Sequence, residues 1–330
     1  MKIVSLFSGC GGLDYGFEKA GYEVVWANEI DKSIELTYRQ NHKSTILETR
    51  DIRTLLHSDI PECDGIIGGP PCQSWSEGGK GLGIEDGRGK LFLDYIRIVI
   101  EKKPKFFLIE NVRGILEDKH SDAFNMFLGK LTEANYVVTY SLVNCADYRI
   151  PQDRYRVFIM GISNEYCTHY LFPNPVSSSK VTLKDAIGDI VIEPAKYLSE
   201  NVPTNTFFPN HDTYIGPFDR KFMARNRVRG WNEVSFTIQA QAKNEPLHPQ
   251  APKMIFKSKD KRIFKPGYEH LYRRLSVREC ARIQTFPDSF KFEYTNILDG
   301  YKMVGNAVPP RMAQYLAEQL KLILKLKLKV

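Results

Sequence analysis

Residues 3–12 read IVSLFSGCGG, and this stretch decides the fold. The apolar run at 3–7 predicts a short strand, the glycines after it predict a turn, and residues 13–20 predict a helix that ends at Gly21. Glycines between a strand and a helix let the backbone approach a ligand and expose amide groups at the helix N-terminus. The stretch therefore predicts the first strand–turn–helix unit of an α/β domain that binds a ligand at its turn.

The same alternation continues through the N-terminal half of the chain. Apolar runs predict further strands at 24–27, 65–68, 106–109 and 157–160, and a helix-like segment occupies 91–101. Strand–helix–strand alternation favours a parallel sheet with helices on both faces. We expect the α/β class, with a doubly wound, mostly parallel sheet.

The character of the sequence changes near Pro173. From there to about residue 294 prolines, asparagines and short apolar runs dominate, which indicates a smaller, loop-rich domain. We expect a first domain over 1–178, the small domain over 179–294, and a C-terminal segment over 295–330 that returns to the first domain. The last segment has a helical apolar face, and we interpret its lysine–leucine end as the end of that helix rather than as a strand.

Composition excludes several classes of protein. The chain has 330 residues, a net charge of +7, 42% hydrophobic and 26% charged residues, which is ordinary for a globular protein and not for a disordered or collagen-like one. No apolar run approaches the roughly 18 residues of a membrane span, and the apolar start is too short for a signal peptide. The six cysteines form no Cys-x-x-Cys pair, so we expect neither disulfides nor zinc, and a cytoplasmic location. The basic balance is compatible with a polyanionic partner.

Two acidic positions accompany the glycine turn. The turn spacing is Gly-x-Gly-Gly, which departs from the Gly-x-Gly-x-x-Gly fingerprint and weakens a nicotinamide interpretation. Glu29 follows the second strand about twenty residues on, where a carboxylate can accept both hydroxyls of a ribose. Asp51 and Ile52 could bind an adenine edge. The pattern predicts a ligand with a ribose and an adenine, and the alternative is a tight turn with incidental surface acids.

A cysteine follows the strand at 65–68. Residues 68–76 read GGPPCQSWS, and residues 77–89 are rich in glycine. The two prolines fix the backbone and hold Cys72 at the carboxyl edge of the sheet, where doubly wound folds place their chemistry. The glycine-rich segment predicts a lid that closes over a substrate. We interpret Cys72 as a nucleophile rather than as a small buried apolar residue.

Further blocks follow in order along the chain: Glu-Asn-Val at 110–112, Gln-Asp-Arg-Tyr-Arg at 152–156, Arg-Arg-Leu-Ser-Val-Arg-Glu at 273–279 and Gly-Asn-Ala-Val-Pro at 305–309. Together with Phe-Ser-Gly-x-Gly-Gly and Gly-Pro-Pro-Cys-Gln-Ser, they resemble the DNA cytosine-5 methyltransferases over nearly the whole chain. The segments at 226–229 and 247–252 are similar to those of the compact GGCC-type modification enzymes of type II restriction systems.

The resemblance implies a Rossmann-like fold that binds S-adenosyl-L-methionine, with no metal. It assigns the cofactor site to one set of residues: Phe7, Gly9, Gly11, Gly12, Glu29, Ile30, Asp51, Ile52, Pro70 and Asn306. Asn306 would also tie the C-terminal helix back onto the cysteine loop. The family commonly has Gly-Asp where this chain has Arg50-Asp51, so the side chain of residue 50 puts the local turn in doubt.

The resemblance also implies a catalytic set. Addition of a thiolate to cytosine C6 makes C5 nucleophilic, and Cys72 would supply that thiolate. Glu110 would contact N3 and N4 of the base. Arg154 and Arg156 alternate before an apolar strand and would both hold the base at O2, although either could be a surface ion pair. No side chain is an obvious base for the C5 proton, so water is the default.

The implied partner is double-stranded DNA, with the target cytosine flipped out of the helix. Ser76 and Arg88 of the glycine-rich lid would contact one side of the duplex. The small domain would supply further contacts: Arg225, Arg227, Arg229 and Lys243.

Alternating arginines on an extended segment would face one way and read guanines, which predicts a GC-rich palindrome, with GGCC and its inner cytosine first. Two features put GGCC in doubt. Similar enzymes have Gly-Arg where Ala242-Lys243 stands, and Glu245 could accept from a cytosine amine.

The implied enzyme is a monomer that protects DNA from a cognate restriction endonuclease acting on the same site, with no membrane partner; the residues leave a dimer open. Two alternatives remain. One is a methyltransferase acting on cytosine in transfer RNA, which the large second domain disfavours. The other is a catalytically silent DNA-binding module, which would have little reason to keep Cys72, Glu110 and two arginines together. A nicotinamide dehydrogenase is disfavoured by the glycine spacing.

Overall fold

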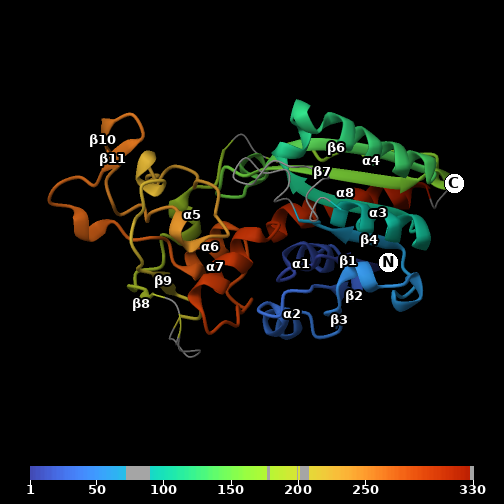
Figure 1. Ribbon diagram of the computed structural model, residues 1–330, viewed down its shortest axis with the longest axis horizontal. Coiled ribbons are helices and arrows are strands. Elements are labelled where there is room, and N and C mark those ends of the chain that lie inside the picture. Colours follow the sequence, from blue (N-terminus) through green and yellow to red (C-terminus); the bar gives the residue numbers. More distant parts are fainter. Residues whose placement is uncertain (72–89, 177–178, 199, 201–207, 328–330) are drawn as a thin grey trace.

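The computed structural model describes residues 1–71, 90–176, 179–198, 200 and 208–327, and Figure 1 shows their arrangement. One end of the molecule is a seven-stranded sheet in the order β3-β2-β1-β4-β5-β7-β6. Its strands are β1 (Lys2–Leu6), β2 (Glu23–Asn28), β3 (Ile46–Glu48), β4 (Gly65–Gly68), β5 (Phe106–Val112), β6 (Tyr136–Asn144) and β7 (Tyr155–Ser163).

The sheet is parallel from β3 to β5, whereas β7 lies antiparallel between β5 and β6. This confirms the predicted doubly wound, mostly parallel sheet. The strand order reverses between β1 and β4, which makes the carboxyl ends of these two strands the place where a ligand crevice forms. Strand β6, which pairs with β7 at the edge of the sheet, and the short β3 were not among the predicted strands.

Helices cover both faces of the sheet. They are α1 (Gly12–Lys19), α2 (Glu35–Asn41), α3 (Lys90–Lys102), α4 (Ser121–Glu133) and α8 (Pro310–Lys327). Successive residues of the central strands enter different cores: Ile3 packs in the cluster that holds α1 and α8 residues, and Val4 packs in the cluster that holds α3 and α4 residues. Strands buried on both faces explain the continuous apolar runs in the sequence.

The C-terminal helix depends on one glycine. A Cβ at Gly16 of α1 would lie 2.4 Å from the Cβ of Ala313 on α8, so only glycine lets the two helices approach this closely. The helix extends to Lys327, which supports the helical interpretation of the lysine–leucine end. No helix of the described residues is long and apolar enough to cross a membrane.

The loop-rich part occupies the other end of the molecule in Figure 1. Its elements are α5 (Leu183–Ile187), β8 (Ala195–Tyr197), β9 (Asp212–Tyr214), β10 (Ile255–Ser258), β11 (Lys261–Ile263), α6 (Val277–Ile283) and α7 (Ile297–Asn306). Residues of α7 share a core with α5 and α6, whereas α8 lies on α1. Lys302 and Met303 of α7 also contact Asp31 and Cys10 of the first domain, and the predicted return of the chain from residue 295 stays a prediction.

Candidate active site

The glycine turn after β1 adopts the left-handed conformation that its residues suggest. Gly9 and Gly11 have φ angles of 55° and 88°, and Phe7 also has a positive φ of 54°. A Cβ at Gly11 would lie 2.0 Å from Nε2 of His42, so a side chain has no room there. Gly9 and Gly12 line the cavity described below, whereas Gly11 does not. Gly11 therefore shapes the turn against His42, and its predicted contact with the cofactor stays a prediction.

Glu29 holds the turn from the end of β2. One of its carboxylate oxygens accepts from the backbone N–H of Gly9 and the other from that of Asp31, both at 2.9 Å. Burial raises the pKa of Glu29, and the two backbone donors act in the opposite direction. The predicted ribose acceptor is therefore built into the glycine turn, about twenty residues away in the sequence, with oxygen lone pairs left for a ligand.

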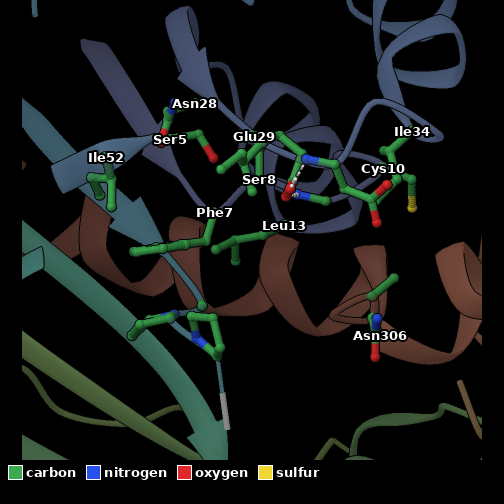
Figure 2. Close-up of a pocket in the computed structure, with 18 of the residues that line it drawn as sticks. Ser5, Phe7, Ser8, Cys10, Leu13, Asn28, Glu29, Ile34, Ile52 and Asn306 are labelled. Atoms are coloured by element: carbon green, nitrogen blue, oxygen red, sulfur yellow. Dashed lines mark hydrogen bonds between the residues drawn. The ribbon is translucent and has the colours of Figure 1, made fainter. Parts of the chain in front are cut away.

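A cavity of about 370 Å³ opens at the reversal of strand order. Figure 2 shows Phe7, Glu29 and Ile52 around it, with Asn306 approaching from the end of α7. Most of the residues predicted for the cofactor line it: Phe7, Gly9, Gly12, Glu29, Ile30, Asp51, Ile52, Pro70 and Asn306. The side chain of Ile30 is 56% exposed beside it, an apolar surface that a flat ring could cover.

Asp51 lies at the rim of this cavity. Its carboxylate accepts from the backbone N–H of Arg53 at 3.0 Å and pairs with the Arg53 guanidinium, and these contacts lower the pKa of Asp51. Arg50, which departs from the family pattern, pairs with Glu48 instead and does not line the cavity. The side chain of residue 50 therefore leaves Asp51 in its expected place.

The residues present fit an adenosine-bearing cofactor. Carboxylates of Glu29 and Asp51 stand among apolar surfaces, which suits a ribose and an adenine. The buried hydroxyl of Ser8, which also lines the cavity, has no hydrogen-bond partner among the described residues and is available to a ligand.

Sequence reasoning missed several lining residues. Asn28 and Asp31 flank Glu29 and were within reach of the same argument. Met303, Ala307 and Val308 come from the far end of the chain, where only the tertiary fold could reveal them.

Glu110 and Arg156 form an ion pair at the edge of the same cavity. Arg156 Nε lies 2.8 Å from Glu110 Oε1, and the two side chains are only 16% and 12% exposed. Glu110 lies within β5 rather than after it, opposite Phe158 of the antiparallel β7. A Cβ at Gly69 would be 3.1 Å from Glu110 Oε2, so the cysteine loop begins directly beneath this carboxylate.

Cys72 itself, and the predicted DNA contacts Ser76 and Arg88, lie outside the described residues. The described chain reaches Pro71, and both prolines line the cavity. The carbonyl of Pro70, predicted to hold the exocyclic amine of the base, accepts a hydrogen bond from the side chain of Asn111 at 3.3 Å. The start of the cysteine loop is thereby fixed to β5.

A second cavity, of about 410 Å³, lies on the other side of the ion pair. It is lined by residues of both parts of the molecule: Val112, Arg113, Gly114, Asp153, Tyr155, Arg156, Phe236 and Thr237. Glu110 lines the first cavity and Arg156 the second, so the ion pair separates them.

Arg154 is not in either cavity, which corrects its predicted contact with the base. Its side chain is fully buried and donates to the carbonyls of Ile238, Gly305 and Ala307 at 3.2, 2.9 and 3.0 Å. Arg154 precedes the first residue of β7, so the alternation expected of a strand does not carry it to the face of Arg156. It joins the sheet, the small domain and the turn before α8.

The predicted DNA-reading arginines have different partners. Arg227 donates to the carbonyl of Phe222 at 3.0 Å and stacks on its ring, whereas Arg229 reaches Asp153 at 3.3 Å across the two parts of the molecule. Arg225 is exposed. The expected alignment of the three arginines towards DNA stays a prediction.

Glu245 and Lys243 have different environments. Glu245 is completely buried and accepts from the backbone N–H of Gln239 at 2.9 Å, and burial raises its pKa well above the usual range. It cannot accept from a base and instead closes the loop over 239–245, which corrects the expectation for this residue. Lys243 lies exposed on a short helical turn of that loop, Ala242–Asn244.

Fold and site together define a doubly wound α/β protein with a ligand-sized cavity at the switch point of its sheet and a charged pair beside that cavity. The chain belongs to the C-5 cytosine-specific DNA methylase family, whose model matches residues 1–322. Membership implies S-adenosyl-L-methionine as the methyl donor and DNA as the substrate. Among the described residues no group of histidine, cysteine and acidic side chains could hold a metal ion.

Curated relatives and a solved structure agree with this family. The chain is 49% identical to the type II methyltransferase M.FnuDI of Fusobacterium nucleatum, covering 97% of this chain and 94% of the relative. It is 50% identical to M.MthTI of Methanothermobacter thermautotrophicus, covering 97% of each. A prophage-encoded DNA modification methyltransferase of E. coli superposes with a TM-score of 0.76 at 24% identity, over 98% of this chain and 99% of that one, which shows the shared fold.

Proposed function

We propose that the chain transfers a methyl group from S-adenosyl-L-methionine to C5 of a flipped cytosine in a short GC-rich palindrome. GGCC, with its inner cytosine as the target, is the first candidate sequence. The reaction proceeds through a covalent adduct between Cys72 and C6 of the base. The enzyme acts as a monomer on double-stranded DNA and protects that DNA from a cognate restriction endonuclease, which acts on the same site without binding this chain.

The Glu110–Arg156 pair is the observation that carries the proposal. It lies between a cavity with ribose and adenine acceptors and a second cavity that opens between the two parts of the molecule. A base in the second cavity and a cofactor in the first would meet at this pair. The cysteine loop begins beneath Glu110, which supports Cys72 as the group that attacks from that edge.

The chemistry follows from these residues. The Cys72 sulfur forms a bond to C6, and the electron pair of the C5–C6 double bond becomes available at C5. S-adenosyl-L-methionine, when held by Glu29 and Asp51, would supply the electrophilic methyl group that C5 accepts, with S-adenosyl-L-homocysteine as the leaving product. Water removes the C5 proton, the double bond re-forms, and the sulfur leaves C6 as thiolate.

Glu110 and Arg156 prepare the base for this attack. The Glu110 carboxyl would accept from the N4 amine and share a proton with N3, and the proton at N3 would make C6 more electrophilic. The Arg156 guanidinium orients Glu110 at 2.8 Å and is placed to hold O2, where negative charge develops. The Glu110 and Arg156 side chains are nearly buried, and electrostatic interactions are stronger there than in water because the dielectric constant is lower.

Residues that line the first cavity would hold the cofactor. Glu29 would accept from the ribose hydroxyls, Asp51 from the adenine amine, and Ile30 and Ile52 would pack on the adenine ring. Phe7 and Gly9 flank the methionine portion. Asn306 closes the site from α7, and its backbone neighbours are the carbonyls that Arg154 holds.

The target cytosine must leave the duplex to reach the second cavity. Ser76 and Arg88 of the glycine-rich loop would contact the duplex from one side, and Arg225, Arg227, Arg229 and Lys243 from the other. The side chain of Arg225 is exposed for such a contact. Arginine on guanine O6 and N7 favours a G-rich half-site, and in a palindrome the other half is then C-rich.

Two assays on the full chain test the proposal. Methyl transfer from labelled S-adenosyl-L-methionine is measured on duplex DNA and on transfer RNA, and we expect it on DNA alone. Incubation with duplex containing 5-fluorocytosine should trap a covalent complex through Cys72, because fluorine at C5 blocks the final elimination. Transfer to RNA alone, or the absence of a trapped complex with an active enzyme, would contradict the proposal.

A further inference from the structure

The hairpin β10–β11 is the most basic exposed feature of the small domain. Residues 253–265 contain six lysines or arginines and one aspartate, a net charge of +5 against +7 for the whole chain. The lysines at 257, 259 and 261 form no ion pair among the described residues. Charge of this density on so short a segment indicates a polyanionic partner.

Strand β10 of the hairpin is uncovered, whereas β11 is partly buried beside the short helical turn Phe222–Ala224. All four residues of β10 are exposed, including Ile255 at 40% and Phe256 at 63%. Strands usually bury at least one face, and a lone two-stranded hairpin has marginal stability in water. Arg262 lies opposite Phe256 and 5.4 Å from its ring, which leaves a mixed aromatic and cationic surface. Such a surface is typical of contacts with nucleic acid.

The base of the hairpin adjoins the arginine segment proposed to read DNA. Met254, the residue before β10, donates its backbone N–H to the Asn226 side chain at 3.0 Å. Met254 shares a core with Phe222 and Val228, which flank the same segment. The hairpin therefore projects from the arginine segment at 225–229, and Figure 1 shows the hairpin at the outer end of the small domain.

The length of the hairpin sets its reach. The four residues of β10 span about 13 Å, which matches about four base pairs of duplex. The tip is a two-residue turn at Lys259 and Asp260, with Asp260 at a φ of 57°. Lys257 is the extra residue of a bulge between the pairs formed by Phe256 and Ser258. The three lysines thus lie along β10, at the tip and at the start of β11, towards the end of the hairpin that is far from Met254.

We propose that the β10–β11 hairpin is an accessory arm that binds phosphates of the duplex flanking the target sequence. This inference rests on the proposed DNA methyltransferase function and extends it. The arm contributes affinity that depends on DNA length and salt and carries no base specificity. An anionic membrane would also attract lysines and phenylalanine, but the attachment to the recognition segment favours DNA.

The test compares duplex lengths. Lys257, Lys259 and Lys261 are changed together to glutamine, and binding is measured by fluorescence anisotropy on a duplex of about 12 base pairs and one of about 30, both centred on the target sequence. The control changes three exposed lysines of the sheet domain to glutamine, Lys43, Lys103 and Lys130, which removes the same charge.

We expect the hairpin variant to bind the long duplex about tenfold more weakly at about 0.1 M salt, with a salt slope lower by about 2–3. Binding to the short duplex and the rate of methylation at saturating short duplex should not change. The proposed arm would be contradicted if the hairpin variant lost the same affinity for both duplexes or lost none for either. It would also be contradicted if the control variant lost as much affinity as the hairpin variant. So would a variant that loses binding to phosphatidylserine vesicles but not to DNA.

Wild-type methylation of the short duplex separates the two proposals. If the wild-type enzyme methylates neither duplex, the proposed function is wrong. If it methylates both and the hairpin variant binds them as the wild type does, the function stands and the arm is wrong.

Discussion

Arg154 Nη2 donates to the carbonyl oxygen of Ala307 at 3.0 Å, and this contact places the first arginine of the Gln-Asp-Arg-Tyr-Arg block in the interior of the protein. Arg156, two residues later, pairs with Glu110 at the cavity edge instead. Two arginines that a motif presents together therefore have different tasks. One positions the turn before α8, and the other lies at the cavity where we propose that the base binds.

Because of this difference, replacement by lysine should reduce mainly stability at Arg154 and mainly activity at Arg156. Arg154→Lys loses the planar fork that serves three carbonyls and leaves buried acceptors unpaired, so we expect the free energy of unfolding to fall by about 1–3 kcal/mol. Arg156→Lys keeps a positive charge beside Glu110, so it should reduce stability less than Arg154→Lys does, and it should lower kcat because its group lies at the cavity. Chemical denaturation and single-turnover methyl transfer, measured on both variants, give the two quantities. An Arg154→Lys enzyme of wild-type stability would argue against the positioning role.

Glu279 predicts the behaviour of the protein in acid. It is completely buried in α6, and although burial favours its neutral form, hydrogen bonds and charge from Arg273 lower its pKa to about 2. A carboxyl with a lowered folded-state pKa contributes stability that is present above the unfolded pKa, near 4.5, and is lost as pH falls towards 2.

Glu279→Gln should therefore remove a contribution on the order of 3 kcal/mol at neutral pH, and should flatten the loss of stability between pH 5 and about pH 2. Urea unfolding at several pH values measures this. Asp288→Asn, at a half-exposed surface pair with Arg282, is the comparison and should change the profile much less. A Glu279→Gln profile parallel to that of the wild type would show that Glu279 does not govern the acid sensitivity.

The sequence predicted the parts of the fold and site that local pattern determines. The strand and glycine turn at 3–12 lie where expected, and Glu29 meets Gly9 because the second strand of a doubly wound unit ends beside the first. Long-range burial was not predictable. Glu245 looked like a base contact because its loop is polar, yet it satisfies a backbone donor inside the small domain. Strand β6 was missed because its middle residues are partly or fully exposed and its pattern is mixed.

Glu29 gives a direct test of the cofactor site. Glu29→Ala removes the acceptor for the ribose and releases the N–H of Gly9, so affinity for S-adenosyl-L-methionine should fall by about 1.5–3 kcal/mol. Titration calorimetry measures this without turnover. Glu48→Ala removes a carboxylate that pairs with Arg50 outside the cavity and should leave the affinity unchanged. Unchanged affinity in Glu29→Ala would remove Glu29 from the cofactor site.

Cys72 is tested by separating chemistry from binding. Cys72→Ser should abolish methyl transfer and the 5-fluorocytosine complex, because a hydroxyl is a far weaker nucleophile than a thiolate. Binding of S-adenosyl-L-methionine and of duplex DNA should persist. Cys167→Ser, at an exposed free cysteine far along the chain, is the control and should retain activity. Near-normal turnover in Cys72→Ser would contradict the covalent mechanism.

Arg225 offers the sharpest test of which DNA sequence the enzyme recognises. Of the three arginines in its segment, it alone has an exposed side chain, whereas Arg227 is tied to the carbonyl of Phe222 and Arg229 to Asp153. Bisulfite sequencing of plasmid DNA from expressing cells should show methylation at a GC-rich palindrome, first GGCC at its inner cytosine. Arg225→Ala should then cost about 1–3 kcal/mol at one base pair and relax discrimination there, because a guanine loses its bidentate partner.

Arg227→Ala should weaken DNA binding and also lower the stability of the protein, since its backbone contacts are lost together with any contact to a base.

Lys243 decides between GGCC and a related palindrome. Lysine lacks the fork of arginine, so a GGCC pattern would show that a point charge suffices at this position, and Lys243→Arg should then tighten the preference. Methylation centred on AT-rich sites, or spread over all CG steps, would contradict the reading of guanine by this segment.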